Sequence, residues 1–167
     1  MTFTRFFRVM AFVAVVLFMA IPTKADPITF IANLTGSQEV PPQNTSATGF
    51  ATLILNDNGT ATISLTINGV VDQTAAHIHG GAVGVNGPVL FPLPNGSFTN
   101  FSLGTLTALQ IERLSAGLWY VNVHNTAAPG GIIRGQLTAI PEPSTLLLLG
   151  TGLLTAVGVG RRKKNQG

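Results

Sequence analysis

Residues 50–67, FATLILNDNGTATISLTI, decide the fold class of this protein. Two runs of apolar residues flank Asn56-Asp57-Asn58-Gly59, and these residue types accept the positive φ angles of a tight hairpin turn. In the second run, apolar residues at 61, 63, 65 and 67 alternate with polar residues at 62, 64 and 66, the pattern of a half-buried strand. The segment therefore predicts an antiparallel β-hairpin.

Further segments on both sides of this hairpin also have the character of strands. We expect them at five places, namely 28–34, 74–79, 89–93, 117–124 and 132–139. Residues 105–116 differ, because their leucines have near-helical spacing and Gly117 follows them as a stop signal. Seven short strands and one short helix predict a single all-β domain, an antiparallel β-sandwich.

The basic character of the chain is confined to its two ends. The formal net charge is +3, but between residues 26 and 140 only Arg113 and Arg134 are basic, against five acidic residues, so this part has a net charge of −3. Nucleic acid is excluded as a partner, because binding to phosphates needs clustered Lys and Arg in the folded part. The absence of cysteine excludes a disulfide framework, a thiol nucleophile and a thiolate metal site.

Residues 1–25 have the three parts of a secretory signal peptide. Arg5 and Arg8 form a basic start, an uncharged apolar run follows, and small residues occupy the two positions before Asp26 that signal peptidase reads. We therefore predict a signal helix that is cleaved before Asp26. The alternative is a permanent N-terminal anchor, which is disfavoured because the apolar run is shorter than the ~20 residues that span a bilayer.

The C-terminal segment, residues 141–167, also has three parts. Pro141-Glu142-Pro143 is followed by an apolar run rich in Leu and Gly, and then by a basic cluster that begins with Arg161 and Arg162. The apolar run predicts a hydrophobic helix that acts as a weak membrane anchor, and the basic cluster predicts a cytoplasmic C-terminus.

This three-part tail resembles the PEP-CTERM sorting signal of Gram-negative bacteria, which is processed by a membrane protease-transpeptidase called an exosortase. The resemblance implies cleavage near residues 141–144, an inner-membrane intermediate, and delivery to the cell surface or the extracellular matrix. An ordinary tail anchor that keeps the segment is the alternative, although it has no need of Pro-Glu-Pro.

All three histidines of the protein lie between the two terminal segments. His77 and His79 share one face of an expected strand, and Tyr120, Asn122 and His124 share one face of another. If these strands are neighbours, three imidazoles converge and offer Zn²⁺ or Cu²⁺ three ligands with an open fourth position. The alternative is a hydrogen-bonded polar ladder of His, Asn and Tyr. We favour the ladder, because no acidic residue near the His-x-His segment is available to support a metal ligand.

Five motifs follow one another along the middle of the chain: LTGSQEVPP at 34–42, AAHIHG at 75–80, NGP at 86–88, GLWYVNVH at 117–124 and PGGIIRGQL at 129–137. This series resembles a CHRD domain, which was named from chordin and also occurs singly in exported bacterial proteins. The resemblance implies an immunoglobulin-like β-sandwich over residues 26–140, with a His-x-His strand similar to that of copper/zinc superoxide dismutase. It implies no established catalytic activity.

The last motif departs from the CHRD pattern at one position. The family usually has Gly-Gly-Glu-Ile-Arg-Gly there, and in this chain Ile132 stands in place of the Glu. Arg134 thereby loses an acidic neighbour on its face of the strand, which makes Glu39 its expected partner. If that ion pair is buried, a Glu39→Gln change should lower the melting temperature.

The residue patterns give little support to an enzyme. The sequence has no recognisable serine–histidine–aspartate arrangement, no phosphate-binding glycine loop before a helix, and no paired carboxylates within one motif. We therefore expect a binding or structural module of the cell envelope or extracellular matrix, with an extracellular polysaccharide or an envelope protein as its partner and no certain cofactor. The alternative is a copper- or zinc-dependent oxidoreductase that resembles superoxide dismutase and uses the three histidines.

Overall fold

The structure of the protein is a computed structural model that describes residues 26–140. The predicted signal helix at 1–25 and the predicted hydrophobic helix at 141–167 lie outside the described residues. Among residues 26–140, no helix has the length and apolar character needed to cross a membrane.

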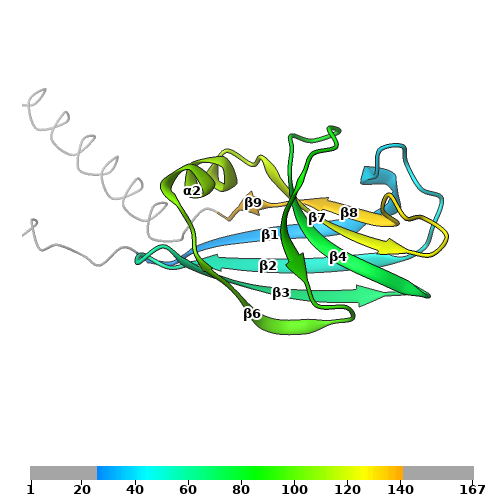
Figure 1. The fold of residues 1–167 in the computed structure, drawn as a ribbon, viewed down its shortest axis with the longest axis horizontal. Coiled ribbons are helices and arrows are strands. Elements are labelled where there is room, and N and C mark those ends of the chain that lie inside the picture. The colour runs from blue at the N-terminus through cyan, green and yellow to red at the C-terminus, as the bar shows by residue number, and fades with distance from the viewer. Residues whose placement is uncertain (1–25, 141–167) are drawn as a thin grey trace, which may run out of the picture.

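The described residues form nine β-strands, one α-helix and one short 3-10 helix. In chain order the strands are β1 (Ile28–Thr35), β2 (Thr48–Leu55), β3 (Thr60–Asn68), β4 (Gln73–Gly80), β5 (Val89–Leu93), β6 (Phe98–Thr105), β7 (Trp119–Asn125), β8 (Ile133–Gln136) and β9 (Thr138–Ala139). The 3-10 helix η1 (Gly36–Gln38) follows β1, and the α-helix α2 (Ala108–Ser115) connects β6 to β7 (Figure 1).

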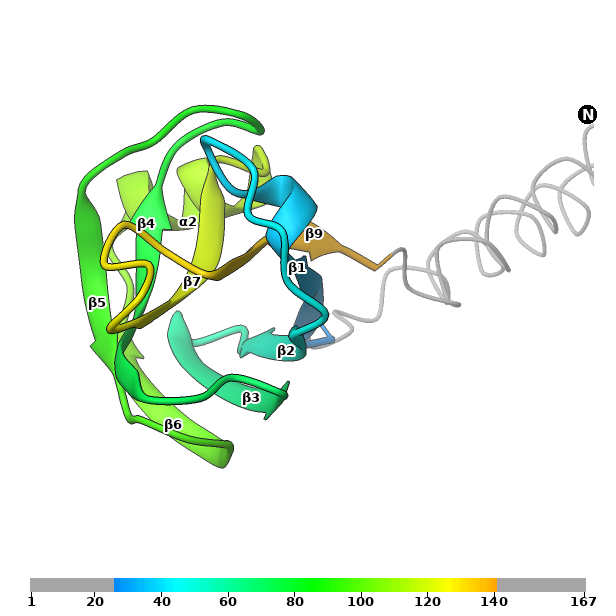
Figure 2. The same ribbon diagram turned by 90° about the vertical axis from the view of Figure 1, so that its right-hand side faces the viewer.

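All strand pairs are antiparallel, and they form one sheet with the order β5-β4-β7-β8-β1-β2-β3-β6. The sheet curls until it is nearly closed, so that β4 and β7 face β2 and β3 as two layers (Figures 1 and 2). β9 lies outside this order and pairs with β1. The predicted all-β, antiparallel fold with one short helix is confirmed, and its two layers are parts of one hydrogen-bonded sheet.

The hairpin predicted at 50–67 is formed by β2 and β3. The two strands pair along their whole length, from Thr48 opposite Asn68 to Leu55 opposite Ala61. At the turn, Gly59 has a φ of +81°, and the Asn58 side chain accepts hydrogen bonds from both the backbone N–H and the hydroxyl of Thr60. The turn fixes the register, and the register keeps the apolar residues of both strands on one side.

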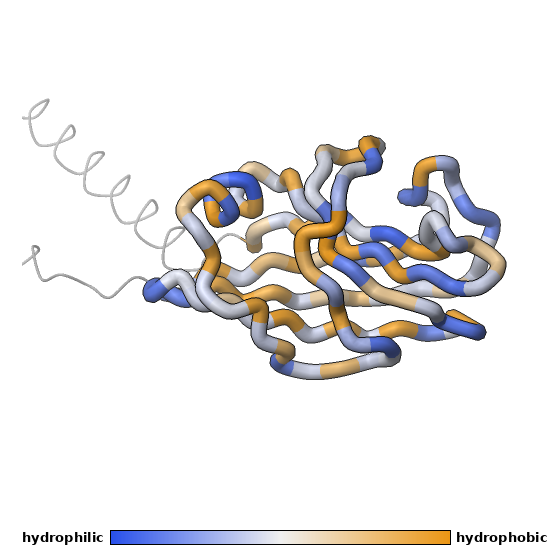
Figure 3. The backbone as a smooth tube through the Cα atoms, in the orientation of Figure 1, coloured by the Kyte–Doolittle hydropathy of each residue, from blue (hydrophilic) through white to orange (hydrophobic). Residues whose placement is uncertain are grey.

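The core lies between the two layers. Apolar residues alternate with polar ones along the strands, as the colours of Figure 3 show, and the apolar side chains face inward. Trp119, Phe30, Leu53, Ile63 and Ile78 are among the largest side chains that are fully buried. Because the chain has no cysteine, this apolar burial holds the layers together without help from a disulfide.

The helix α2 lies within the predicted segment 105–116 and is capped at its N-terminus by Thr107. The Thr107 hydroxyl accepts from the backbone N–H of Gln110, and the Gln110 side chain accepts from the backbone N–H of Thr107, which is a capping box. Gly117 follows the helix with a φ of +69° and ends it. Leu114 is fully buried and anchors the helix to the core.

Two strand predictions were wrong in detail. The sequence analysis missed β6, whose residues are mostly exposed and whose pairing with β3 is shifted at two places, so that no regular alternation marks it. The single strand predicted at 132–139 is divided into β8, which pairs with β7, and β9, which pairs with β1. Since β8 pairs with both β7 and β1, it connects the two layers of the sheet.

Candidate metal centre

The candidate site lies on the outer face of β4 and β7, the side away from the core. The two strands are neighbours, and their register places His79 opposite Tyr120 and His77 opposite Asn122. His124 lies two residues beyond Asn122 on the same face of β7. The strand pairing on which convergence of the three histidines depended is therefore present.

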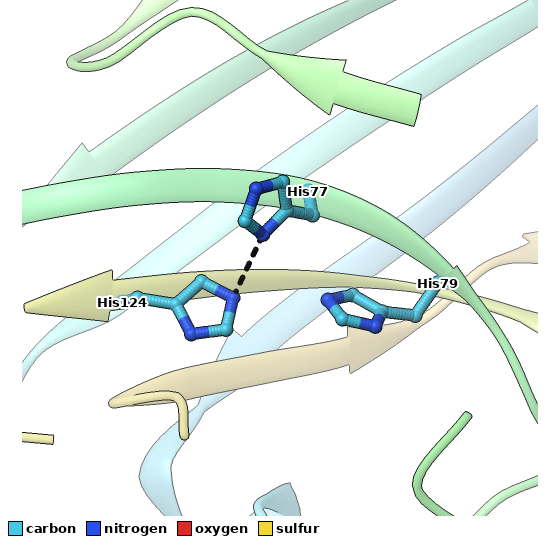
Figure 4. A group of neighbouring side chains, drawn as sticks. All are labelled: His77, His79 and His124. Atoms are coloured by element: carbon cyan, nitrogen blue, oxygen red, sulfur yellow. Dashed lines mark hydrogen bonds between the residues drawn. The ribbon is translucent and has the colours of Figure 1, made fainter. Parts of the chain in front are cut away.

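The three imidazoles form a compact cluster (Figure 4). One ring nitrogen of each histidine can be chosen so that all three nitrogens lie within 4.8 Å of one another. The closest pair is His77 Nδ1 and His124 Nε2, which are 3.1 Å apart. His79 and His124 are only 9% and 8% exposed, whereas His77 is half-buried.

The backbone determines which ring nitrogen carries the proton in two of the histidines. His79 Nδ1 lies 2.9 Å from the carbonyl oxygen of Gly87, and His124 Nδ1 lies 2.9 Å from that of Pro129. A carbonyl oxygen can only accept, so both Nδ1 atoms carry a proton, and in the neutral form of each ring it is Nε2 that presents the lone pair. Metal-bound histidines have the same arrangement, because they donate their second ring N–H to a carbonyl or a carboxylate.

The two Nε2 lone pairs have different surroundings. His124 Nε2 accepts a hydrogen bond from His77 Nδ1. His79 Nε2 is buried and has no hydrogen-bond partner. A buried polar atom without a partner is unusual in a native protein and needs a physical explanation.

The surroundings keep two of the rings neutral. Burial lowers the pKa of His77, and the neighbouring His124 and His79 lower it further. Burial also lowers the pKa of His124, against the hydrogen bond to Pro129, which raises it. Both rings are therefore neutral at pH 7, and neutral imidazole is the form that binds a metal ion.

Glu39 is buried against this face but does not belong to the histidine cluster. Its carboxyl group is close to Asn122, whose Nδ2 lies 3.5 Å from Glu39 Oε2, while Oε1 has no hydrogen-bond partner. Burial raises the pKa of Glu39 to about 7, although the charge of Arg134 and the hydrogen bond from Asn122 act in the opposite direction. Within residues 26–140, no aspartate or glutamate joins the three histidines.

Arg134 does not pair directly with Glu39, contrary to the sequence-based expectation. Its guanidinium group donates to Asn86 Oδ1 at 3.2 Å and to the carbonyl oxygens of Ala82 and Val85 at 3.0 Å each. These oxygens belong to the loop between β4 and β5, so the planar group of Arg134 holds this loop in place. The side chain is 1% exposed, which makes the hydrogen bonds to the loop essential to its burial.

Tyr120 connects Arg134 to the histidine cluster. Arg134 Cζ lies 3.5 Å from the centroid of the Tyr120 ring, and the ring of His79 stacks on Tyr120 with centroids 5.1 Å apart and planes inclined by 10°. The Tyr120 hydroxyl accepts from the backbone N–H of Gly87 at 3.1 Å. Arg134 and Tyr120 thus both hold residues 81–88, the loop whose Gly87 carbonyl orients His79.

The sequence analysis missed the backbone groups that complete the site. The carbonyls of Gly87 and Pro129 orient two histidines, and main-chain acceptors have no signature in residue type. The glycines beside them were also missed as packing positions. A Cβ at Gly87 would collide with the carbonyl oxygen of Gly80, and a Cβ at Gly131 would lie 2.6 Å from Glu39 Oε1. Only the motifs at 86–88 and 129–131 marked these loops.

The fold and these contacts define a nearly closed antiparallel β domain with a polar cluster on its outer face. The family model of the CHRD domain matches residues 30–137, which is more than half of the 167 residues. The chain therefore belongs to the CHRD domain family. All three histidines lie within the matched residues.

The model of the PEP-CTERM protein-sorting motif matches residues 139–164, a range that includes Pro141, Glu142, Pro143, Arg161 and Arg162. Such a signal indicates exosortase-dependent export and sorting to the cell surface or extracellular space of a Gram-negative bacterium. The signal peptide at 1–25 and its cleavage by signal peptidase stay predictions. No curated protein and no solved structure matches the chain.

Proposed function

We propose that this protein is a binding module of the cell surface that holds one divalent transition metal ion, Zn²⁺ or Cu²⁺, through His77, His79 and His124. The observation that carries the proposal is the buried, unpartnered Nε2 atom of His79. A metal ion within the cluster would accept this lone pair and remove the cost of leaving it without a partner.

The polar ladder that the sequence favoured explains less. It accounts for the hydrogen bond between His77 and His124 and for the two bonds to backbone carbonyls. It leaves His79 Nε2 without a donor, although that atom belongs to the same group of converging nitrogens. A metal site keeps both carbonyl bonds, which leave the Nε2 atoms of His79 and His124 free to act as ligands, and it replaces the hydrogen bond between His77 and His124 with bonds from both nitrogens to the metal ion.

The spacing of the nitrogens is close to what a metal ion requires. Zinc binds imidazole nitrogens at about 2.0–2.1 Å in a tetrahedral arrangement, which places two ligand nitrogens about 3.3 Å apart. His77 and His124 already meet that spacing, and no ligand pair exceeds 4.8 Å. Metal binding would require the His79 nitrogen to move closer to the other two, and His77 would then carry its proton on Nε2 instead of Nδ1.

A binding role is favoured over a redox role. The alternative that resembles superoxide dismutase would use a bridging carboxylate and a fourth ligand from the chain. The protein has only three histidines, and no carboxylate of residues 26–140 joins them. CHRD domains and PEP-CTERM signals are also not enzymatic families. An extracellular polysaccharide or an envelope protein remains the proposed partner of the surface module.

The test is the metal content of the full chain, purified in detergent without a histidine tag and dialysed against trace zinc and copper. Because the chain has three histidines and no cysteine, retained metal can be assigned with little ambiguity. We expect about one metal ion per chain, and we expect none in a His77→Ala, His79→Ala double variant.

The matched control is Thr74→Ala, a change on the same strand at an exposed residue. It should leave the metal content unchanged. Metal-free wild-type protein, or metal that the double variant retains, would reject the proposed site and restore the polar ladder as the explanation of the cluster.

A further inference from the structure

We infer that a metal ion held by the three histidines takes a carboxylate, supplied by another molecule, as its fourth ligand. The inference rests on the proposed metal site and names the chemical class of the ligand that the site would take. Three features of the structure support it: the number of protein ligands, the local charge and the exposure of His77.

Residues 26–140 offer no fourth ligand. The three histidines are the only ones in the protein, there is no cysteine, and no aspartate or glutamate of residues 26–140 joins the cluster. Zinc bound by three protein side chains keeps its fourth position for water or for a ligand from solution. The site therefore has one position that an external oxygen ligand can occupy.

The local charge favours an anion at that position. Three neutral imidazoles leave the full +2 charge of the metal uncompensated, and Arg134 adds a positive charge to the same face of the sheet. Glu39 is the carboxyl group packed against this face, and its burial disfavours the charged form. A bound carboxylate supplies the missing negative charge where water is largely excluded, and its oxygen is a normal ligand of zinc.

The exposure of the three residues indicates where the ligand enters. His79 and His124 are nearly buried, and the backbone of two loops, at Gly87 and Pro129, contacts their Nδ1 atoms. His77 is half-buried and pairs with Pro92 of β5, which is the last strand at its edge of the sheet. The fourth position therefore opens beside His77, at the sheet edge, where a carboxylate that projects from a small molecule or from a polymer can reach it.

The test uses Co²⁺ as a probe, because the visible absorption of bound Co²⁺ reports a change in its ligands. The full chain in detergent is loaded with Co²⁺, and its spectrum is recorded during titration with acetate, galacturonate, polygalacturonate or neutral dextran. We expect acetate and galacturonate to shift the spectrum to the same final form, and dextran to leave it unchanged. The Thr74→Ala protein should behave like wild type.

The outcomes separate this inference from the proposal on which it rests. One Co²⁺ per chain whose spectrum no carboxylate changes would overturn the carboxylate ligand and leave the metal site intact, whereas failure to bind Co²⁺ would remove both. A shift at a much lower carboxylate concentration with polygalacturonate than with galacturonate would support the inference and identify an acidic polysaccharide as the source. Equal concentrations would support it with a small carboxylate as the source.

Discussion

The inner and outer faces of β4 and β7 are built from alternate residues of the same two strands, yet burial has different results on them. On the inner face, Ile78 and Val121 are fully buried apolar side chains that have no polar atom to satisfy. On the outer face, His79 and Asn122 are nearly as buried, and each keeps a polar side-chain atom without a hydrogen-bond partner. The inner face therefore stabilises the fold, whereas the unpartnered polar atoms of the outer face cost stability.

The largest difference in stability between the two faces should appear when neighbouring residues of β4 are replaced by alanine. We expect Ile78→Ala to lower the free energy of unfolding by about 2–5 kcal/mol, because it leaves a cavity in the core. His77→Ala should cost only about 1 kcal/mol, the worth of one hydrogen bond, while it abolishes metal binding. Urea denaturation of the metal-free proteins measures both values. Equal losses from the two changes would mean that the faces do not differ as described.

The loop between β7 and β8 should tolerate alanine at Gly130 but not at Gly131. Gly131 has a φ of +132°, and a Cβ there would approach both Asn122 and Glu39 Oε1. Gly131→Ala should therefore destabilise the protein by roughly 1–3 kcal/mol. Gly130→Ala is the matched control, since a Cβ at that position meets nothing within 4 Å. Thermal unfolding of both variants decides the point, and similar melting temperatures would contradict the close packing at Gly131.

On the outer face, we expect Arg134 to act as a positioning residue, because it holds the loop 81–88 whose Gly87 carbonyl orients His79. Arg134→Lys keeps the charge but loses the planar fork that donates to Ala82, Val85 and Asn86. We expect metal affinity to fall about 10–100-fold, as for other groups that orient a metal ligand indirectly, with a changed Co²⁺ spectrum. Arg113→Lys, which replaces the other arginine of residues 26–140, is the control. Unchanged affinity and spectrum in Arg134→Lys would show that loop 81–88 orients His79 without Arg134.

The smallest effect should be the pH dependence that Glu39 gives to stability. The pKa of Glu39 is raised from its ordinary value of 4.5 to about 7 in the folded protein. Between these two values the folded state binds more protons than the unfolded state, so the contribution of Glu39 to stability falls as the pH rises through this window. His77 and His124, whose pKa values are lowered, contribute in the opposite sense below pH 6.5.

A Glu39→Gln variant isolates this contribution, since the histidines are common to both proteins. We expect the variant to melt higher than wild type at pH 8 and near it at pH 4.5. This reverses the outcome expected from a buried ion pair, because Arg134 donates to the loop and not to Glu39, and the Gln amide can donate to the unpartnered Asn122 Oδ1. A lower melting temperature at pH 8, followed by circular dichroism, would restore the ion-pair explanation.

The sequence predicted the strands whose pattern is local. The β2–β3 hairpin could be predicted because its turn residues and its alternation agree, and α2 could be predicted because its leucine spacing and its glycine stop agree. β6 was not readable, since Asn100 and Gly104 have positive φ angles and interrupt the alternation. The structure of an irregular strand of this kind depends on pairing with its neighbour, and its own sequence shows no alternation from which it could be predicted.

The candidate site was predictable only in part, for a similar reason. Alternation placed His77 with His79, and Tyr120 with His124, on shared faces, but only the register of β4 against β7 brings the two pairs together. The contacts that matter most for His79 come from the backbone of a loop, and backbone contacts cannot be read from residue types. The side chain of Glu39 lies close to Asn122, 83 residues away in sequence, and no local pattern distinguishes this partner from Arg134.

The pairing of β9 with β1 has a mechanical consequence. The backbone N–H of Ile140 bonds to the carbonyl of Thr29 near the start of β1. At the other end of β1, Thr35 pairs with Arg134. Arg134 lies opposite Asn122, which in turn lies opposite His77. Six residues of extended strand separate these points by about 20 Å. A domain tethered through residue 140 and gripping a ligand at the histidines would therefore carry tension along β1. Backbone hydrogen bonds between paired strands are loaded together when a force acts along the strands, so the β1–β9 pairing would share such a load among its hydrogen bonds.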